Sequence, residues 1–262
     1  MHMNSEFRYI TSTIKKYDGI CYIVGSYYRD MIEGYKQSEY FVATNLLANK
    51  IKEIFKPYVI EDYSNLLGNI VLDINNVRFE VETFKLNENK FRKEEFKGYT
   101  NNIEEDVLTR DFTINAIYVG EDDIIDLKNG IKDINDKIIR TVVEPKISFK
   151  QDPLRMLKAL CIMSKYDYDI ACDVEEAIIF NIDLLKYVNT NIRVKYIKYF
   201  IQGKYFIKVF NKYQYIFNAL YPEFNKLINI KVNGTIDDNI KLLVEYFNIN
   251  EKSEFIIDNP LL

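Results

Sequence analysis

The segment "EEDVLTRDFTINA" (residues 104–116) contains three acidic residues, a charged pair and one asparagine among apolar residues. Arg110 and Asp111 begin a predicted short turn, and Asn115 follows four residues after Asp111. Residues four apart in a helical turn lie on one face, so these polar groups can converge. Taken alone, they are better explained as caps or surface charges. Their meaning depends on the flanking segments.

Before this segment, the sequence predicts alternating short strands and helices. "GICYIVG" (19–25) is typical of a buried strand, residues 26–34 of a short helix, and residues 45–55 of an amphipathic helix. Residues 69–74 and 77–84 alternate apolar and polar side chains, which predicts two strands joined by a hairpin.

After residue 140 the pattern becomes helical. "DPLRMLKALCIMSK" (152–165) begins with Asp152 as the predicted N-cap and Pro153 at the first helical position. We therefore predict an α+β protein with a mixed-sheet head at residues 1–145 and a helical part at residues 146–262. Residues 85–102 are polar and charged without a sustained period, which predicts a long mobile loop.

Composition excludes several classes of protein. The chain has 262 residues, 48% of them hydrophobic, and a net charge of −4, so a basic surface can only be local. The single histidine, His2, weighs against histidine-dependent zinc sites and Ser-His triads. Cys21, Cys161 and Cys172 are predicted to be core residues of a protein in the reducing cytoplasm. The absence of a long apolar stretch or signal pattern favours a soluble protein with no membrane partner.

Two further motifs could contact a nucleotide. "VGSYYRD" (24–30) places Gly25 and Ser26 between a strand and a helix, where backbone N–H groups can face an anion. In "FKQDPLRMLKAL" (149–160), Asp152 and Arg155 are three residues apart and can offer an acceptor and a planar donor fork to the edge of a base. A plain turn and a helix cap are the simpler readings of each motif alone.

Together, and in this order, the motifs resemble those of class II CCA-adding enzymes and bacterial poly(A) polymerases, within the DNA polymerase β nucleotidyltransferase superfamily. "VGSYYRD" is similar to the family's G-G/S-x-V-R-D, "FEVETF" to E-V-T-T-F, and "EEDVLTRDFTINA" to E-E-D-L-x-R-R-D-F-T-I-N-A. "DPLRMLKAL" is similar to the start of the family's E-D-P-x-R helix, although Gln151 replaces the glutamate. A full-length member is longer, so the resemblance implies a shortened C-terminal part.

The resemblance implies template-independent addition of nucleotides to an RNA 3′ end, with ATP or CTP as substrate or ligand and Mg²⁺ as cofactor if the site is active. It assigns contacts with the triphosphate to Gly25, Ser26, Arg29 and Asp30. It assigns the ribose and the link between head and neck to Arg110, Asp111 and Asn115. It assigns recognition of the base edge to Asp152, Arg155 and Lys158.

The family's catalytic D-x-D is missing, because the ungapped count from "VGSYYRD" places Glu39-Tyr40-Phe41 at that position. Two magnesium ions need hard oxygen ligands, and phenylalanine has none. We therefore predict that nucleotidyl transfer is impaired or lost, as in a pseudoenzyme. The alternative is an active enzyme that uses Glu39, Glu80 and Glu82 as catalytic carboxylates, with Glu39 and Glu80 holding metal. Phe41 could also simply extend the core over a closed cleft.

The C-terminal part contains a basic stretch without Asp or Glu, from Leu184 to Pro222. Positive charge interleaved with aromatic rings suits an RNA backbone and unstacked bases, so we predict RNA binding here, with a tRNA-like 3′ end as the partner. A protein partner is also possible. Most of the aromatic residues are individually predicted to be core. The candidate RNA-binding residues are Arg193, Lys195, Lys198, Lys204 and Lys208.

Overall fold

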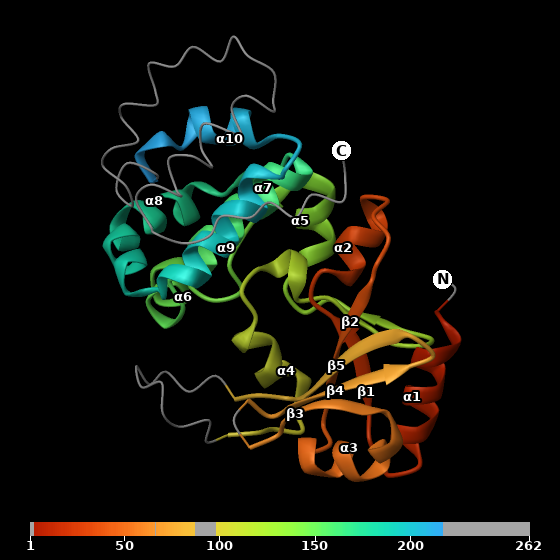
Figure 1. Cartoon of the computed structure of the whole chain (residues 1–262). Coiled ribbons are helices and arrows are strands. Elements are labelled where there is room, and N and C mark those ends of the chain that lie inside the picture. The colour runs from red at the N-terminus through yellow and green to blue at the C-terminus, as the bar shows by residue number, and fades with distance from the viewer. Residues whose placement is uncertain (1–2, 66, 87–97, 217–262) are drawn as a thin grey trace. The chain divides into compact units, whose positions relative to one another are not determined.

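A computed structural model describes residues 3–65, 67–86 and 98–216. The chain forms two compact units, Met1–Gln151 and Asp152–Leu262 (Figure 1). The first unit contains a seven-stranded mixed sheet, and helices dominate the described part of the second. This is the α+β architecture that the sequence predicts. The boundary predicted from sequence, between residues 145 and 146, falls at the start of the last helix of the first unit.

The first unit alternates helices with the strands of its sheet. Its helices, including the 3-10 helices η1–η3, are α1 (Ser5–Lys15), α2 (Tyr27–Ile32), α3 (Ala48–Ile54), η1 (Lys56–Tyr58), α4 (Ile103–Asp106), η2 (Val107–Thr109), η3 (Thr113–Asn115), α5 (Gly130–Asp136) and α6 (Pro145–Gln151). Its strands are β1 (Cys21–Val24), β2 (Glu39–Thr44), β3 (Val59–Tyr63), β4 (Asn69–Ile74), β5 (Val77–Thr83), β6 (Tyr118–Val119), β7 (Ile124–Ile125) and β8 (Ile138–Ile139).

The sheet has the strand order β3-β4-β5-β2-β1-β6-β7. β2 and β5 pair in parallel, and the other neighbouring strands are antiparallel. The predicted hairpin joins β4 to β5 through Asn75 and Asn76, whose φ angles of 53° and 63° suit a tight two-residue turn. The parallel β2–β5 pair lies near the middle of the sheet, where both strands have a partner on each side.

Helices cover one face of the sheet at β4 and β5, and the other face of β5 is only partly buried. α3 packs against β4 and β5, and the ring of Tyr9 on α1 contacts Phe55 at the end of α3. The β5 side chains on the covered face, Phe79 and Val81, are buried. The intervening residues of β5 are polar and only partly buried. The strand pattern therefore leaves one polar face beside the central strands.

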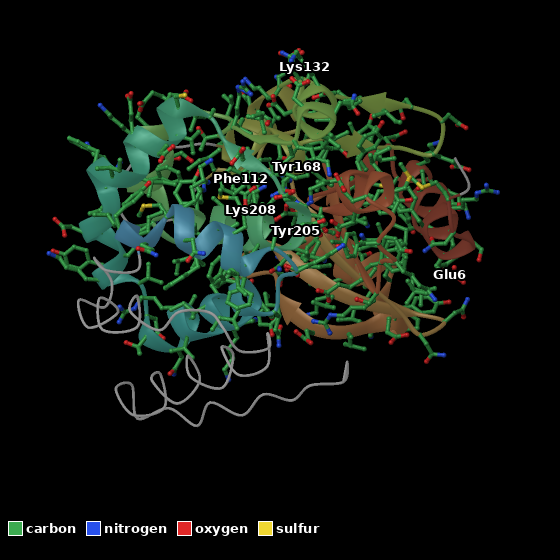
Figure 2. The ribbon with its side chains drawn as sticks, turned by 90° about the horizontal axis from the view of Figure 1, so that it is seen from above. Glu6, Phe112, Lys132, Tyr168, Tyr205 and Lys208 are labelled. Atoms are coloured by element: carbon green, nitrogen blue, oxygen red, sulfur yellow. The ribbon has the colours of Figure 1, made fainter. Side chains whose placement is uncertain are left out.

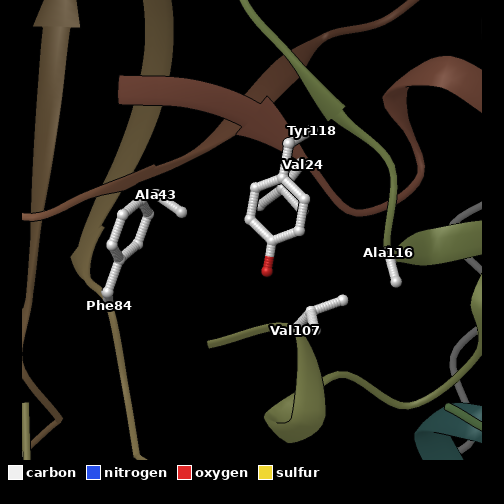
Figure 3. Close-up of a cluster of buried hydrophobic side chains, with 6 residues drawn as sticks. All are labelled: Val24, Ala43, Phe84, Val107, Ala116 and Tyr118. Atoms are coloured by element: carbon white, nitrogen blue, oxygen red, sulfur yellow. The ribbon is translucent and has the colours of Figure 1, made fainter. Parts of the chain in front are cut away.

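A second hydrophobic cluster lies toward the end of β1 and β2. The hydroxyl of Tyr118 within it donates to Asp106 at 2.6 Å, which satisfies a polar group in an apolar setting. Its buried members are Val24, Ala43, Phe84, Val107, Ala116 and Tyr118 (Figure 3). The cluster connects the central strands to the "EEDVLTRDFTINA" segment within the first unit.

The second unit begins with a long helix. Its elements are α7 (Leu154–Tyr166), β9 (Asp169–Ile170), α8 (Cys172–Asn181), η4 (Ile182–Tyr187), α9 (Thr190–Ile201) and α10 (Phe206–Lys212). α7 packs against α9 and α10, and apolar side chains of these helices, such as Leu160 and Ile197, are buried. Within the described ranges, no helix is both long enough and apolar enough to cross a membrane.

Two helix starts differ from the prediction. α3 begins at Ala48 rather than at residue 45, because Asn45 lies in the bend after β2 and its side chain accepts a hydrogen bond from the Ile20 amide at 2.8 Å. α7 begins at Leu154, one residue after the predicted first position. Pro153 is the N-cap of this helix, so the prediction that Asp152 is the N-cap is wrong, although the Asp152 carboxylate accepts a hydrogen bond from the Leu154 amide at 3.0 Å.

The cysteines also differ from one another. Cys21 is buried and Cys161 is half-buried, and burial raises the pKa of each thiol to about 12, so both are protonated at neutral pH. Cys172 is exposed, so the prediction that it is a core residue is wrong. It is the first residue of α8, whose neighbouring residue Asp173 also faces solvent. Most of the predicted mobile loop, residues 87–97, lies outside the described residues.

Candidate functional site

The polar face of the sheet brings the predicted carboxylates together. Residues two apart in a strand share a face, and the β2–β5 register pairs Glu39 with Arg78, Phe41 with Glu80 and Ala43 with Glu82. Glu61 on β3 reaches the same face through the β3–β4 and β4–β5 registers. We call this surface the acidic face, defined by Glu39, Phe41, Glu61, Arg78, Glu80 and Glu82.

Phe41 lies on the acidic face and is 38% exposed. It therefore does not extend the hydrophobic core, which removes one of the three readings of this substitution. The ring also lies beside Gly25, because a Cβ added to that glycine would be 3.8 Å from the Phe41 ring. The apolar ring of Phe41 therefore lies between the Gly25 turn and Glu80.

Glu39 is bound by an arginine of the neighbouring strand. Arg78 Nε lies 3.3 Å from Glu39 Oε2, and its Nη1 lies 2.9 Å from Glu61 Oε1. Tyr63 donates to the other oxygen of Glu61 at 2.9 Å. The hydrogen bond from Arg78 and that from Tyr63 lower the pKa of Glu61, so this carboxylate is ionised at neutral pH.

Glu80 has a more apolar setting than Glu39. Its Oε1 accepts a hydrogen bond from the side-chain amide of Asn69, which is buried. Burial is the largest influence on Glu80 and raises its pKa, with Glu82 and Glu39 adding repulsion. Ionising Glu80 therefore costs more here than in water.

Glu82 belongs to a compact charge network. Its two carboxylate oxygens lie 2.5 Å from Arg110 Nη1 and 2.6 Å from Lys85 Nζ. Arg110 also contacts the fully buried carboxylate of Asp106 at 2.6 Å. Burial alone would raise the pKa of Glu82, but the charges and hydrogen bonds of Arg110 and Lys85 outweigh it and lower the pKa to about 2.

These carboxylates do not fit a two-magnesium site as they are arranged. Such a site needs oxygen ligands that converge on two ions about 4 Å apart. Phe41 offers no oxygen, Glu39 is held by Arg78, and Glu82 is held by Arg110 and Lys85. Among the described residues, no cluster of three or more His, Cys, Asp or Glu side chains could hold a metal ion.

Two residues of the predicted triphosphate corner, Arg29 and Asp30, are buried. Arg29 and Asp30 form an ion pair of 2.9 Å with side chains only 6% and 9% exposed, so this pair does not lie on the surface. Asp30 also accepts from Gln37 at 2.9 Å. The guanidinium of Arg29 donates to the side-chain oxygen of Asn115 on η3. The corner therefore joins α2 to the "TRDFTINA" segment.

Asn115 is the centre of this connection. Its side-chain amide donates to Asp111 at 2.9 Å, so the predicted convergence of these two residues is present. Its backbone carbonyl accepts from the Gly25 amide at 3.1 Å. The Gly25 N–H is thus already used, and Ser26, the N-cap of α2, has no side-chain capping bond. Arg110 points elsewhere, to Glu82 and Asp106.

The predicted base-edge residues lie at the start of the second unit. Arg155 is buried, at 8% exposure, within the first turn of α7. Lys158 lies one turn further on, and its Nζ is 3.9 Å from Asp152 Oδ2. Asp152 and Lys158 therefore lie on the same side of the start of α7.

The basic stretch is partly neutralised by acidic residues from outside it. Lys208 on α10 lies 2.5 Å from Asp167, and Lys212 lies 2.7 Å from Asp169 (Figure 2 labels Lys208 and Tyr205). Lys195 is exposed and lies over the Tyr199 ring at 5.7 Å, as the exposed Lys204 does over Tyr205 at 5.3 Å. Arg193 and Lys198 on α9 are half-buried.

The aromatic residues of this stretch range from buried to exposed. Phe200, Phe206 and Tyr213 are buried, as the core reading predicts. Tyr199 is 48% exposed beside Lys195, so its ring is accessible to a ligand.

Residues 21–140 match the poly(A) polymerase head domain family. The CCA-adding enzyme of Geobacillus stearothermophilus is 33% identical over 183 residues, which cover 69% of this chain and 45% of that protein. The chain belongs to the class II CCA-adding enzyme and bacterial poly(A) polymerase family. The CCA-adding enzyme of Bacillus subtilis is 31% identical over 186 residues, or 70% of this chain and 46% of that enzyme.

Solved structures of the family agree with the fold. The Bacillus stearothermophilus CCA-adding enzyme in complex with CTP aligns with a TM-score of 0.72 and 29% identity over 79% of this chain and 51% of that one. The Thermotoga maritima CCA-adding enzyme complexed with tRNA aligns with a TM-score of 0.71 at 19% identity, over 94% and 58% of the two chains, and supports the fold alone. This family member spans about half the length of the curated relatives it matches.

Sequence reasoning missed the partners of the family residues. Gln37, Asn69 and Asp106 bind Asp30, Glu80 and Arg110 in turn. Asp106 had a usable signal, because it lies four residues before Arg110. Arg78 also had a usable signal, since it lies two residues before Glu80 and therefore shares one face of the strand with Glu80 and Glu82. The contacts of Gln37 and Asn69 depend on tertiary packing that no local spacing reveals.

Proposed function

We propose that this protein binds a nucleoside triphosphate, ATP or CTP, and an RNA 3′ end, and that its metal-dependent nucleotidyl transfer is impaired or lost. One observation carries the proposal: an exposed phenylalanine, Phe41, stands beside Glu80 where the family resemblance places the second catalytic aspartate. Nucleotide binding is supported by the CTP complex of the 29% identical relative. The names of the CCA-adding relatives support a tRNA-like RNA.

The intact parts of the family pattern favour retained binding. Arg29, Asp30 and Asn115 form a buried, hydrogen-bonded corner beside Gly25, and such preorganisation supports a bound anion better than mobile side chains do. The exposed lysines and tyrosines of α9 and α10 supply charge and stacking surface suited to RNA. A cytoplasmic location is part of the same proposal.

The alternative is an active template-independent RNA nucleotidyltransferase that uses Glu39, Glu80 and Glu82. The three carboxylates share one face of the sheet, which favours this reading. Their partners weigh against it, because freeing Glu82 for a metal means breaking contacts to both Arg110 and Lys85. The loss of one cation from a bridged site removes several kcal/mol of charge stabilisation, which is why we prefer the impaired reading.

A transfer assay separates the two functions. Labelled ATP and CTP are incubated with a mixed RNA pool and the full chain, with Mg²⁺ or Mn²⁺. We expect no extension of RNA 3′ ends by the native protein, and extension at rates typical of a working polymerase would overturn the proposal. Nucleotide binding, followed by calorimetry, is expected to change little when EDTA is added, whereas a metal-dependent site would lose most of its affinity.

A variant with both aspartates tests nucleotide binding separately from metal binding. Restoring both aspartates (Glu39→Asp with Phe41→Asp) removes the ring and returns oxygen ligands to β2. If the rest of the site is intact, nucleotide affinity without metal stays close to that of the native protein. Loss of nucleotide binding in both proteins would count against the binding proposal itself.

A further inference from the structure

The substitution at Phe41 is not the only change that affects the acidic face. Arg78 follows directly from the strand register, because the parallel pairing of β2 and β5 sets it beside Glu39. Its side chain is 38% exposed, and its guanidinium contacts carboxylates of two different strands, Glu39 on β2 and Glu61 on β3. A single side chain thus bridges strands on both sides of β5.

The contact between Arg78 and Glu39 affects the binding of any other cation at Glu39. Arginine stays protonated at all ordinary pH values, and its planar fork suits two carboxylates at once. A divalent ion bound by Glu39 would have to displace Arg78 or share the carboxylate with it. In the second case the ion and the guanidinium would repel each other at short range. Either outcome weakens metal binding independently of residue 41.

We propose that Arg78 acts as a resident cation that keeps divalent metal off the acidic face, so that aspartates at positions 39 and 41 do not suffice to rebuild a metal site. This inference rests on the proposed loss of the two-ion site and names a second cause for it. Arg78 is a positioning residue here, since it acts through Glu39 and Glu61. The carboxylate contacts of 3.3 Å and 2.9 Å carry the proposal.

The test measures Mn²⁺ binding by electron paramagnetic resonance and needs no enzymatic activity. Four proteins of 262 residues are compared: the native chain, the variant with Glu39→Asp and Phe41→Asp, the same variant with Arg78→Thr added, and the same variant with Arg78→Lys added. Threonine suits a strand and has no charge. Circular dichroism and thermal unfolding confirm that each protein is folded.

We expect Arg78→Thr to tighten Mn²⁺ binding about 10- to 100-fold relative to the double-aspartate variant, the range in which neighbouring groups tune metal affinity. Arg78→Lys keeps the charge, so it should bind Mn²⁺ as weakly as the double-aspartate variant. Equal, tight binding by the double-aspartate and Arg78→Thr proteins would overturn the role of Arg78. Tight binding by the lysine variant would overturn the charge argument.

A control separates a local effect from the loss of any positive charge. Lys52 pairs with Asp62 at 2.6 Å, and Asp62 alternates with Glu61 along β3, so this pair lies on the opposite face of the same sheet. Lys52→Gln in the double-aspartate background should leave Mn²⁺ affinity unchanged. A gain as large as that of Arg78→Thr would overturn the proposal. Tight Mn²⁺ binding by the native chain would instead overturn the proposed function.

Discussion

Arg110 and Glu82 lie 28 residues apart in the sequence and are joined by an ion pair of 2.5 Å, with side chains only 14% and 16% exposed. The pair links β5 to the "TRDFTINA" segment and continues to the buried carboxylate of Asp106. A buried charge that loses its partner is costly, because the protein cannot solvate it as water does. This network therefore determines both the stability of the head and the availability of Glu82.

Truncating Arg110 is expected to destabilise the protein strongly. Arg110→Ala leaves Glu82 and Asp106 without their shared cation, and such breaks cost about 3 to 5 kcal/mol. The free energy of unfolding from urea titration measures the effect. Lys132→Ala is the matched control, since Lys132 pairs with Asp136 at an exposed position (Figure 2). That pair should contribute less than about 1 kcal/mol, and equal losses in the two variants would contradict this account.

The same network predicts how stability depends on pH. The pKa of Glu82 falls from 4.5 to about 2 in the folded state. The folded state therefore binds the proton less tightly than the unfolded chain does. Its contribution is fully present above pH 4.5 and is lost as the pH falls toward 2, with a size on the order of 3 kcal/mol. The free energy of unfolding, measured as a function of pH, should therefore fall steeply between pH 4.5 and pH 2. We call this fall the acid limb, and Glu82→Gln should flatten it.

Glu80 provides the opposite sign as an internal comparison. Burial raises its pKa, so its contribution is present below pH 4.5 and is lost as the pH rises through the folded-state value. Glu80→Gln keeps an acceptor for the Asn69 amide while removing the charge. We expect this variant to keep the acid limb and to be at least as stable as the native protein at neutral pH. A flattened acid limb in Glu80→Gln would contradict the assignment of that limb to Glu82.

The glycine at the nucleotide corner offers a matched pair of substitutions. Gly25 and Gly34 both have left-handed φ angles, 82° and 77°, so alanine at either position costs roughly 1 to 2 kcal/mol of stability. A Cβ at Gly25 would approach Phe41 at 3.8 Å, whereas one at Gly34 meets nothing within 4 Å among the described residues. The two variants should lose similar stability by thermal unfolding.

Their nucleotide affinities should differ. The methyl group at position 25 stands in the predicted triphosphate corner, so Gly25→Ala should weaken ATP and CTP binding in calorimetry. Gly34→Ala should bind both nucleotides like the native protein. Equal affinities in the two variants would place the triphosphate somewhere other than the Gly25 turn.

Local sequence patterns predict much of the secondary structure of the head, but few of the side-chain contacts within the site. The hairpin at Asn75-Asn76 follows from turn chemistry, and the β1 strand follows from a short apolar run, because both signals are short-range. The contact of Arg78 with Glu39 depends on β2 and β5 being parallel neighbours, which no local period specifies. The exposure of Phe41 likewise follows from which face of the sheet the helices cover. Sequence alone left that open.

The basic stretch gives the last prediction, which compares a lysine that has an acidic partner with one that lies over a ring. Lys195 is exposed over Tyr199, whereas Lys208 is held by Asp167. Releasing a condensed counterion drives binding to RNA, with a salt slope of about 0.7 per contact for a single strand. Lys195→Ala should therefore lower the slope by about 0.7, while Lys208→Ala should change it less, because Asp167 already neutralises that charge.

Removing the acidic partner tests the same idea in reverse. Asp167 caps α7 in the left-handed conformation, with a φ of 61°, and asparagine adopts this conformation readily. Asp167→Asn should therefore keep the cap, release Lys208 for RNA, and raise both the affinity and the salt slope. Fluorescence anisotropy with a single-stranded RNA oligonucleotide, titrated at several KCl concentrations, measures both quantities. Unchanged binding in Asp167→Asn together with full loss in Lys208→Ala would mean that Lys208 binds RNA despite its partner.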